Sequence, residues 1–473
     1  MDRVSFLIVG GGASGTLLAT QLLRRATKPL QVVIAEPAAL ARGVAYATPH
    51  PEHLLNVPAA RMSALPDEPE HFTRWLVATG QPAPPGGFVA RRVYGDYLEA
   101  TLLHAARMAV PGVRLRWLVD RVDALVPDGQ GQRARLASGE AIAADRVALA
   151  IGNLPGPAPV AVDSDRFIGD PWRAGALDGI SPDDPVAIVG TGLTMVDVVL
   201  LLASRGHSAP IHAFSRRGLL PREGGSVLPS LLPFAPTHRV PGLRAWLRWA
   251  RARQRADSRG DWRATVDALR PVTPAIWQGL SGADRRRFLR HLRPHWDVVR
   301  HRMAPCVAAI LSDLIRGGRV RVEAARVAGA RAASDGLEIT LVPRAGQPRV
   351  QRTSWLVNAT GPEMDVARAR GRSRLLAQLL ADGVARPDQL RLGLDATPAG
   401  SVIDAAGQPS RTLDTLGPPL RGVRWETTAI PEIRVQAQAL ARRWICTTEA
   451  ERAPQDARFA EQAAWSEQAL TRL

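Results

Sequence analysis

VSFLIVGGGASG, residues 4–15, places a short apolar segment directly before a glycine-rich turn. An apolar, β-branched segment of this length is typical of a parallel strand that is buried on both faces. Three glycines then follow in the spacing GxGxxG, which lets the backbone turn tightly and approach a pyrophosphate before a helix starts. Residues 16–23 show the apolar spacing of that helix. The sequence predicts a dinucleotide-binding unit whose phosphate contacts are Gly10, Gly12, Ala13, Ser14 and Gly15.

A second predicted strand, residues 31–35, ends in the carboxylate of Glu36, 21 positions after Gly15. An acid at this position accepts hydrogen bonds from the ribose hydroxyls of an adenosine. Strand, helix, strand and acid occur in the expected order, which makes the motif far more specific than the glycines alone. The alternative is a tight turn that binds no ligand.

The same pattern recurs at residues 186–195, where the strand VAIV precedes GTGLTM and Met195 replaces the third glycine. The next predicted strand, residues 211–214, continues into Ser215 and two arginines instead of an acid. A guanidinium suits the 2′-phosphate of NADPH, because its fork pairs with phosphate oxygens. We expect an NADPH site made by Gly190, Gly192, Leu193, Thr194, Arg216 and Arg217. The alternative is that both arginines are only solvated surface side chains.

Each of the two glycine-rich turns is followed, further along the chain, by segments in which apolar and polar residues alternate. An apolar strand that ends at a glycine then follows. The first set covers residues 114–126 and 133–136 and closes at Gly152, and the second covers residues 319–327 and 337–342 and closes at Gly361. Such closing strands bring backbone close to a bound dinucleotide. We therefore predict an α/β fold of two nested Rossmann-like domains with β-meanders. The FAD-binding domain is discontinuous, residues 1–160 and 346–473, and the NAD(P)-binding domain is residues 161–345.

The composition is that of an ordinary globular protein. The chain has 473 residues, of which 46% are apolar and 22% charged, so disorder and fibrous repeats are excluded. Two cysteines exclude a disulfide framework and a cysteine-rich metal site. Residues 4–9 run straight into glycines, unlike a signal peptide, and no later apolar run reaches the roughly 20 residues of a membrane span. We expect a cytoplasmic protein.

The formal charge of +17 is concentrated in one segment. Residues 239–302 hold 16 arginines against five aspartates, a net charge of +11, together with five tryptophans. Apolar residues follow helical spacing there, so we predict a helical Arg/Trp-rich insert over residues 225–305. The insert could be a lid over an active site, a structural addition whose arginine stems cover apolar surface, or a nucleic-acid surface. The lid is the favoured interpretation, and nucleic acid the least favoured.

Several longer blocks carry a family resemblance. The sequence resembles the bacterial FAD/NAD(P)-binding proteins of the NAD-binding-9 type in residues 43–46, 53–59, 62–64, 71–76, 190–197, 288–293, 296–297, 300–302 and 425–434. More remotely it is similar to class B flavin monooxygenases and amine N-hydroxylases, which share the nested layout. One departure concerns their FxGxxxH fingerprint, because the corresponding linker reads RFIGDPW at residues 166–172, without a histidine. The resemblance implies FAD and NADPH as cofactors.

Candidate residues near the flavin come from the loops. Asn56, a polar residue between apolar neighbours, is the candidate catalytic residue, because its amide could hydrogen-bond a flavin ring edge; the alternative is a loop-capping asparagine. The resemblance implies that the helix after residue 428 points its N-terminus at the flavin pyrimidine, where reduction builds negative charge. The expected FAD contacts beyond the first turn are Glu36, Asn56, Val122, Gly152, Gly361, Thr427 and Thr428.

The expected function is an FAD-dependent, NADPH-consuming oxidoreductase. A monooxygenase that uses O₂ on a small polar or anionic substrate, with amines among the candidates, is the leading hypothesis. One alternative is a flavin oxidase or dehydrogenase that does not use NADPH, and another is a flavin-binding sensor that docks an acidic partner through the insert. No metal, membrane or nucleic-acid partner is expected. The candidate substrate contacts are His291, Arg293, Trp296 and Arg300.

Overall fold

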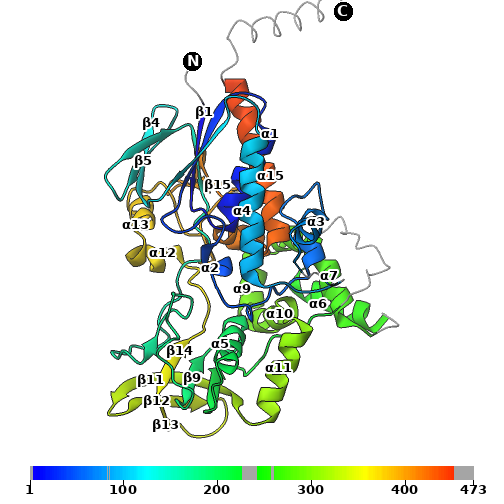
Figure 1. Ribbon diagram of the computed structural model, residues 1–473, viewed down its shortest axis with the longest axis vertical. Helices are drawn as coiled ribbons and strands as arrows, with labels where there is room; N and C mark the ends of the chain where they lie inside the picture. Colours follow the sequence, from blue (N-terminus) through cyan, green and yellow to red (C-terminus); the bar gives the residue numbers. More distant parts are fainter. Residues whose placement is uncertain (1–3, 82–83, 85, 226–241, 257–259, 452–473) are drawn as a thin grey trace, which may run out of the picture.

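The computed structural model describes residues 4–81, 84, 86–225, 242–256 and 260–451. Two sheets made largely of parallel strands, each with its own helices, lie one above the other along the long axis of the molecule (Figure 1). The chain builds most of the first sheet, crosses to build the second, and then returns to complete the first. The predicted α/β fold with two nested Rossmann-like units is therefore confirmed.

The first sheet has six strands in the order β15-β16-β7-β1-β2-β3. These strands are β1 (Val4–Val9), β2 (Leu30–Ala35), β3 (Arg114–Leu118), β7 (Arg146–Leu149), β15 (Ser401–Ile403) and β16 (Pro409–Thr415). All neighbours are parallel except β15 and β16. Phe6, Leu7 and Ile8 of the central strand are fully buried, as a parallel strand covered on both faces requires. Because β16 comes from the C-terminal part of the chain, the first unit is discontinuous.

A separate antiparallel meander lies beside this sheet. It contains β4 (Val122–Asp128), β5 (Gly131–Leu136) and β6 (Ala141–Ala144). Residues 114–118, which the sequence placed at the start of the meander, instead form β3 and pair in parallel with β2. The side chain of Gln378 joins the meander to α13 (Arg374–Ala381), because it bonds both the N–H and the C=O of Leu125 at 3.0 Å.

The second sheet has seven strands in the order β13-β12-β11-β10-β9-β14-β8. These strands are β8 (Phe167–Ile168), β9 (Val186–Val189), β10 (Ile211–Ser215), β11 (Val320–Ala333), β12 (Gly336–Pro343), β13 (Arg349–Thr353) and β14 (Trp355–Asn358). The long strand β11 runs parallel to β10 over residues 320–324 and antiparallel to β12 from Ala325 onward. The second meander is therefore a continuation of the parallel sheet.

The strand pairing corrects the domain boundary expected at residue 346. Both β13 and β14 lie after that residue, yet β13 pairs with β12, and β14 pairs with β9 and β8. The apolar strand β14 closes its own unit, as β7 closes the first, so the second sheet continues to Asn358. The side-chain amide of Asn358 donates to the carbonyls of Pro157 at 3.1 Å and Gly169 at 3.0 Å, which ties the two crossings between the units together.

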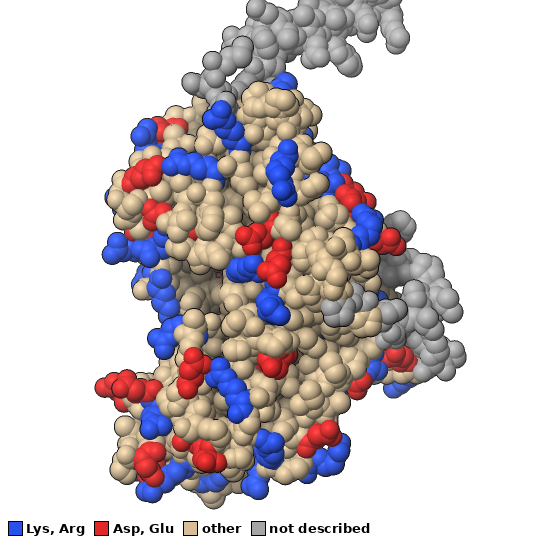
Figure 2. Space-filling model, in the orientation of Figure 1, with Lys and Arg blue, Asp and Glu red and all other residues tan. Residues whose placement is uncertain are grey.

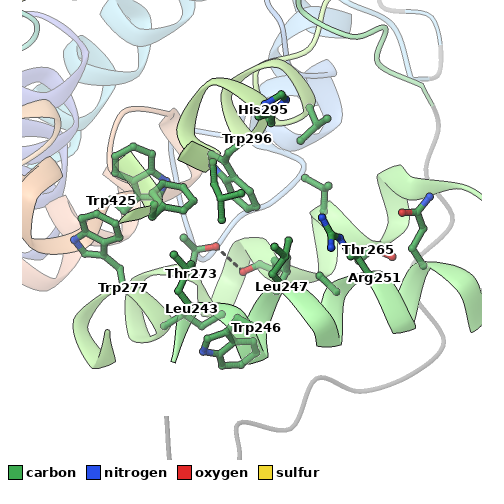
Figure 3. A pocket seen from close by; sticks show the side chains of 18 of the residues that line it. Leu243, Trp246, Leu247, Arg251, Thr265, Thr273, Trp277, His295, Trp296 and Trp425 are labelled. Atoms are coloured by element: carbon green, nitrogen blue, oxygen red, sulfur yellow. Dashed lines mark hydrogen bonds between the residues drawn. The ribbon is translucent and has the colours of Figure 1, made fainter. Parts of the chain in front are cut away.

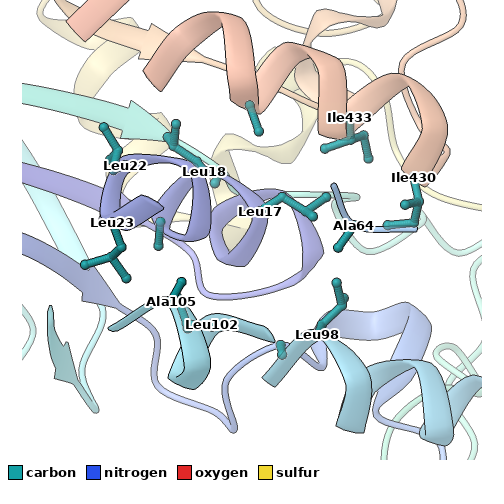
Figure 4. Close-up of a cluster of buried hydrophobic side chains, with 14 of the residues drawn as sticks. Leu17, Leu18, Leu22, Leu23, Ala64, Leu98, Leu102, Ala105, Ile430 and Ile433 are labelled. Atoms are coloured by element: carbon teal, nitrogen blue, oxygen red, sulfur yellow. The ribbon is translucent and has the colours of Figure 1, made fainter. Parts of the chain in front are cut away.

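Three long helices cover one face of the first sheet. Helix α1 (Ala13–Arg25) lies between α4 (Arg91–Met108) and α15 (Ile430–Glu451), as Figure 4 shows. Leu17, Leu18 and Leu22 of α1 are buried in this cluster, together with Leu102 of α4 and Ile433 of α15. The remaining short elements around this unit are α2 (Gly43–Tyr46), η1 (Ala59–Arg61), α3 (His71–Ala78), α12 (Val366–Ala369), η4 (Arg370–Arg372), η5 (Pro418–Leu420) and α14 (Arg421–Arg424).

The Arg/Trp-rich segment is mostly helical where it is described. Its elements are α6 (Leu243–Ala256), α7 (Trp262–Leu269), η2 (Arg270–Val272), α8 (Thr273–Gly279), α9 (Gly282–Arg287), η3 (Phe288–Leu292) and α10 (Arg293–Arg300). Residues 226–241 and 257–259 of the predicted insert lie outside the described residues. Helices α5 (Leu193–Ser204) and α11 (Pro305–Arg316) pack on each other and belong to the core of the second unit.

The described helices include none long and apolar enough to cross a membrane. Basic and acidic side chains are interspersed on the face of the molecule that Figure 2 shows. The described part of that face therefore presents no continuous basic surface of the kind that follows a nucleic-acid backbone.

Candidate functional site

The first glycine turn is built by close backbone packing. Gly10 has φ +102°, and a Cβ there would lie 2.5 Å from the carbonyl oxygen of Ala150. A Cβ on Gly15 would lie 1.9 Å from the carbonyl oxygen of Gly10, so both positions require glycine for the fold itself. Gly12 differs, because the nearest atom to its Cβ would be the Cα of Gly43 at 3.4 Å. Helix α1 starts there without a side-chain cap, so its first N–H groups are available to a phosphate.

The carboxylate of Glu36 stands at the end of β2, beside this turn. Its oxygens accept hydrogen bonds from the N–H groups of Gly11 at 2.8 Å and Ala38 at 3.0 Å. Each carboxylate oxygen has a further lone pair, so the ribose hydroxyls of an adenosine can still be accepted. The structure thus gives Glu36 the place at which the sequence expected it to bind, and shows that the same side chain holds the turn.

The second turn repeats this construction. Gly190 has φ +114°, and a Cβ there would lie 2.2 Å from the carbonyl oxygen of Ala359, which follows β14 as Ala150 follows β7. No atom lies within 4 Å of a Cβ built on Gly192, at the start of α5. Met195, at the position of the third glycine, is fully buried in the core of the second unit. Backbone can therefore approach a phosphate at Gly192 as at Gly12.

The two units differ in the residue that follows the second strand. The N–H of Gly10 donates to Ala35, and the N–H of Gly190 donates to Phe214, so Ser215 stands where Glu36 stands in the first unit. The hydroxyl oxygen of Ser215 lies 2.9 Å from that of Thr191 and accepts a hydrogen bond from Gly218 at 3.0 Å. The place of the carboxylate is therefore taken by an uncharged side chain.

Two arginines follow this serine without acid partners. Arg216 is exposed and Arg217 half-buried. Neither guanidinium forms an ion pair with any acid in the described part of the chain. Two arginines that pair with no described acid suit the 2′-phosphate of a dinucleotide.

The expected flavin contacts do not all gather at one point. Gly152 (φ +64°) and Gly361 (φ +89°) close their strands in the left-handed conformation, with open space where a Cβ would be. Gly152 and Thr428 line a common cavity of about 20 Å³ together with Arg421. Gly361 instead faces the other crossing, since a Cβ on Gly156 would lie 2.2 Å from its carbonyl oxygen.

Thr427 and Asn56 are in contrasting situations. The hydroxyl of Thr427 is fully buried, donates to the carbonyl of Gly417 at 2.9 Å and accepts from the amide of Gln436 at 2.8 Å. Its side chain therefore fixes the loop before α15, and the expected flavin contact of Thr427 stays a prediction. Asn56 is half-buried, and its side-chain amide has no hydrogen-bond partner among the described residues. Val122 is buried at the start of β4.

The candidate substrate contacts in the insert are largely committed to protein groups. The indole N–H of Trp296 donates to Glu426 at 3.1 Å, and Arg300 pairs with the same buried carboxylate at 3.1 Å. Arg293 pairs with Asp297 at 3.3 Å, and His291 is exposed. Arg300 and Arg293 therefore both pair with neighbouring carboxylates, and their contact with substrate stays a prediction. The ring of Trp296 remains available.

One junction between the units was not expected from the sequence. Arg91 of α4 forms an ion pair with Asp197 of α5, with Nη2 and Oδ2 2.8 Å apart and both side chains largely buried. The Nε2 atom of His53 lies 3.1 Å from the carbonyl oxygen of Asp197, and its Nδ1 atom lies 2.7 Å from the hydroxyl of Thr48. Burial raises the pKa of Asp197 to about 6, against the opposing effect of Arg91. Burial, reinforced by Arg91, lowers the pKa of His53 to about 4.

A large cavity of about 660 Å³ lies within the insert (Figure 3). Helices α6, α7, α8 and α10 and residue Trp425 surround it. Its lining includes five tryptophans, namely Trp246, Trp262, Trp277, Trp296 and Trp425. The density of tryptophans in a helical segment is the one sequence feature that points to this cavity. The described residues contain no group of three or more His, Cys, Asp or Glu side chains that could hold a metal ion.

Comparisons with known proteins agree with this geometry. Residues 7–154 match the FAD-NAD(P)-binding family NAD_binding_9. The resemblance to this family is thus confirmed for the stretch that contains the first glycine turn, Glu36 and Gly152. No curated protein matches the chain.

Solved structures of similar architecture cover nearly the whole chain. An ornithine N-hydroxylase from Kutzneria sp. 744 is 17% identical, with a TM-score of 0.63, and covers 95% of this chain and 100% of its own. The ornithine hydroxylase from Pseudomonas aeruginosa is 15% identical, with a TM-score of 0.64, over 94% and 99% of the two chains. L-lysine 6-monooxygenase from Pseudomonas syringae is 17% identical, with a TM-score of 0.63, over 93% and 98%. At these identities the likeness establishes the nested fold.

Proposed function

We propose that this chain is an FAD-dependent, NADPH-consuming monooxygenase. The observation that carries the proposal is the contrast between two equivalent positions: Glu36 in the first unit, and Ser215 followed by Arg216 and Arg217 in the second. An acid suits the ribose of FAD, and two arginines that form no ion pair with a described acid suit the 2′-phosphate of NADPH. The similar solved structures include N-hydroxylases and a lysine monooxygenase, which supports the same reaction type.

The first unit has the features that FAD needs. The open approach at Gly12 and the uncapped start of α1 would receive the pyrophosphate, and Glu36 would accept from the adenosine ribose. The flavin ring is proposed to bind beside Gly152 and Thr428, which line one small cavity. Bound FAD supplies hydride acceptance and the reaction with O₂. Asn56, whose amide is unpartnered among the described residues, is proposed to donate a hydrogen bond to the ring or to the nicotinamide ribose.

The second unit would position the hydride donor. The start of α5 at Gly192 would hold the NADPH pyrophosphate, and Arg216 and Arg217 would bind the 2′-phosphate. The ion pair between Arg91 and Asp197 holds the second turn of α5 against the first unit, and so would help to set the distance between the two binding sites. The overall reaction consumes one NADPH, one O₂ and one proton for each substrate, and yields NADP⁺, water and the oxygenated substrate.

The stoichiometry of the reaction tests this proposal. An oxygen electrode and NADPH absorbance would follow the purified flavoprotein with candidate substrates, and catalase would report hydrogen peroxide. We expect a substrate that raises NADPH and O₂ consumption equally while little peroxide accumulates. Reduction of the flavin by substrate in the absence of NADPH would instead identify an oxidase or dehydrogenase. NADPH oxidation that no substrate accelerates would favour a sensor.

A further inference from the structure

The 660 Å³ cavity of the insert has the size and chemistry of a small-molecule site. Small-molecule pockets are commonly about 300–1,000 Å³ and mostly apolar. Besides its tryptophans, the cavity is lined by aliphatic side chains such as Leu247, Leu269 and Ile276. No acidic residue is among its described lining residues. A ligand that fills it would be held mainly by contact with apolar and aromatic faces.

Three polar side chains at the wall, those of Thr273, Trp277 and Trp296, form hydrogen bonds with other protein groups. The indole N–H of Trp277 donates to the carbonyl of Gly422 at 2.8 Å, and that of Trp296 donates to Glu426. The hydroxyl of Thr273 donates to the carbonyl of Leu269 at 2.8 Å (dashed in Figure 3). These residues therefore present only their ring faces and methyl groups to the interior of the cavity. A diammonium ligand such as ornithine would lose its hydration there without gaining a carboxylate, which is costly.

The charge on the cavity wall is positive. Arg222 and Arg251 belong to the lining, are exposed, and form no ion pair with an acid of the described chain. Guanidinium groups bind carboxylates through paired hydrogen bonds. The cavity therefore combines an apolar interior with two arginines that can bind an anionic group.

The cavity adjoins the place proposed for the flavin ring. Trp425 lines the large cavity and stacks on Trp277, with ring centroids 5.0 Å apart. The guanidinium of Arg421 lies 4.6 Å from the ring of Trp425, and Arg421 lines the small cavity that contains Gly152 and Thr428. Trp425 and Arg421, which contact each other, therefore line neighbouring cavities.

We infer that the substrate is an apolar carboxylic acid, with an aromatic or aliphatic body held by the tryptophans and a carboxylate held by Arg222 and Arg251. This inference rests on the proposed monooxygenase function and names the substrate class of the same enzyme. It differs from the substrates named for the similar structures, which are amino acids with a second amine.

Three probes of nearly equal shape separate the contributions of charge and apolar contact. The holoprotein is titrated by calorimetry with 1-naphthaleneacetate, its neutral amide 1-naphthaleneacetamide, and the cation 2-(1-naphthyl)ethylamine, with L-ornithine as a fourth ligand. We expect the carboxylate to bind at least about tenfold more tightly than the amine, the amide to be intermediate, and L-ornithine not to bind. Equal affinities of the three naphthyl probes, or a preference for either amine, would overturn the inference.

Two variants locate the binding. Ala250→Trp places an indole into the cavity from α6 and should abolish binding of both naphthaleneacetate and its amide. Arg251→Glu should weaken the binding of naphthaleneacetate at least about twofold, and it should leave the binding of the amide unchanged. Arg248→Glu is the matched control, because Arg248 is exposed on the same helix and does not line the cavity. Unchanged carboxylate binding in both Ala250→Trp and Arg251→Glu would refute the site.

NADPH consumption separates the two proposals. If naphthaleneacetate binds and accelerates NADPH oxidation, both the function and the substrate class are supported. If NADPH reduces the flavin but the bound acid has no effect on turnover, the substrate class is wrong while the function stands. If NADPH does not reduce the flavin at all, the proposed function fails, even where the acid binds.

Discussion

Arg91 and Asp197 join the two dinucleotide-binding units through a largely buried ion pair, with Nη2 and Oδ2 2.8 Å apart. Arg91 also forms a hydrogen bond within the first unit, because its Nε atom donates to the carbonyl of Leu54 at 3.1 Å. Asp197 lies in the first half of α5, the helix that starts at the second glycine turn. This pair of side chains, together with the contact between His53 Nε2 and the carbonyl oxygen of Asp197, therefore links the proposed NADPH-binding unit to the proposed flavin unit.

Removing one partner of this pair should destabilise the protein strongly. Asp197→Asn leaves the guanidinium of Arg91 buried without its counter-charge, which typically costs about 3–5 kcal/mol. The thermal midpoint of unfolding should fall by several degrees. Asp313→Asn is the control, because Asp313 pairs with Arg316 on the exposed surface of α11, where such pairs contribute about 0–1 kcal/mol. Equal midpoints for the two variants would contradict a structural role for the Arg91–Asp197 pair.

His53, at the same junction, should affect how the free energy of unfolding depends on pH in acid. The pKa of His53 is about 4 in the fold, below its ordinary value near 6.5, because of burial. Between these values the unfolded chain binds a proton that the fold does not, so stability is lost as pH falls from about 6.5 to about 4. His53→Gln should make unfolding less sensitive to pH in this window, as measured by urea titrations at several pH values. An unchanged slope would contradict a buried, neutral His53.

Asp197 should act in the opposite direction. Its pKa is raised to about 6 in the fold, whereas in the unfolded chain it is near 4. Between these values the folded protein binds a proton that the unfolded chain does not. Stability is therefore gained as pH falls from about 6 to about 4. This gain offsets part of the loss due to His53. Asp197→Asn should therefore make the loss of stability in acid steeper than in the wild type, and a shallower acid limb would be inconsistent with the raised pKa.

The glycines of the first turn should separate folding from cofactor retention. Gly12→Val should give a folded protein with less than about a tenth of the wild-type flavin content, because the side chain would occupy the open approach to the pyrophosphate. Gly15→Ala should impair folding itself, since its Cβ would lie 1.9 Å from the carbonyl oxygen of Gly10. Circular dichroism and flavin absorbance distinguish the two effects. Normal flavin content in Gly12→Val would refute the assignment of this turn to FAD.

The arginines of the second turn should determine the choice of nicotinamide cofactor. Replacing Arg216 and Arg217 together by alanine should raise the KM for NADPH about tenfold or more, because two charge-assisted contacts to the 2′-phosphate are lost. The KM for NADH should change little. Arg321→Ala, an exposed arginine on β11, is the control and should leave both values unchanged. Equal, small effects of the double variant on both cofactors would make these arginines ordinary surface side chains.

Local patterns in the sequence predict the parts of the fold that depend on local chemistry. The two glycine turns, the contrast between Glu36 and Ser215-Arg216, and the helical insert follow from residue spacing and side-chain charge. The boundary predicted at residue 346 would place β14 in the first unit, whereas β14 pairs with β9 of the second sheet. An apolar strand does not by itself show which sheet it joins. Thr427 carries no local sign of its partners Gly417 and Gln436.

Long-range geometry accounts for what the sequence missed. Arg91 and Asp197 are more than 100 positions apart, and nothing in either local sequence indicates that they meet. The Trp-rich composition indicated a helical core, yet a 660 Å³ cavity depends on how far the helices stand apart. The sequence makes Arg300 a candidate substrate contact, and only the fold places Glu426 beside it.

Anaerobic stopped-flow reduction tests the central claim most directly. The purified protein should carry bound FAD with its absorbance near 450 nm, and mixing with NADPH in the absence of oxygen should bleach this band at least about tenfold faster than the same concentration of NADH. A protein that retains FAD but is bleached at equal rates by NADPH and NADH, or by neither, would contradict the assignment of the second unit as the NADPH site.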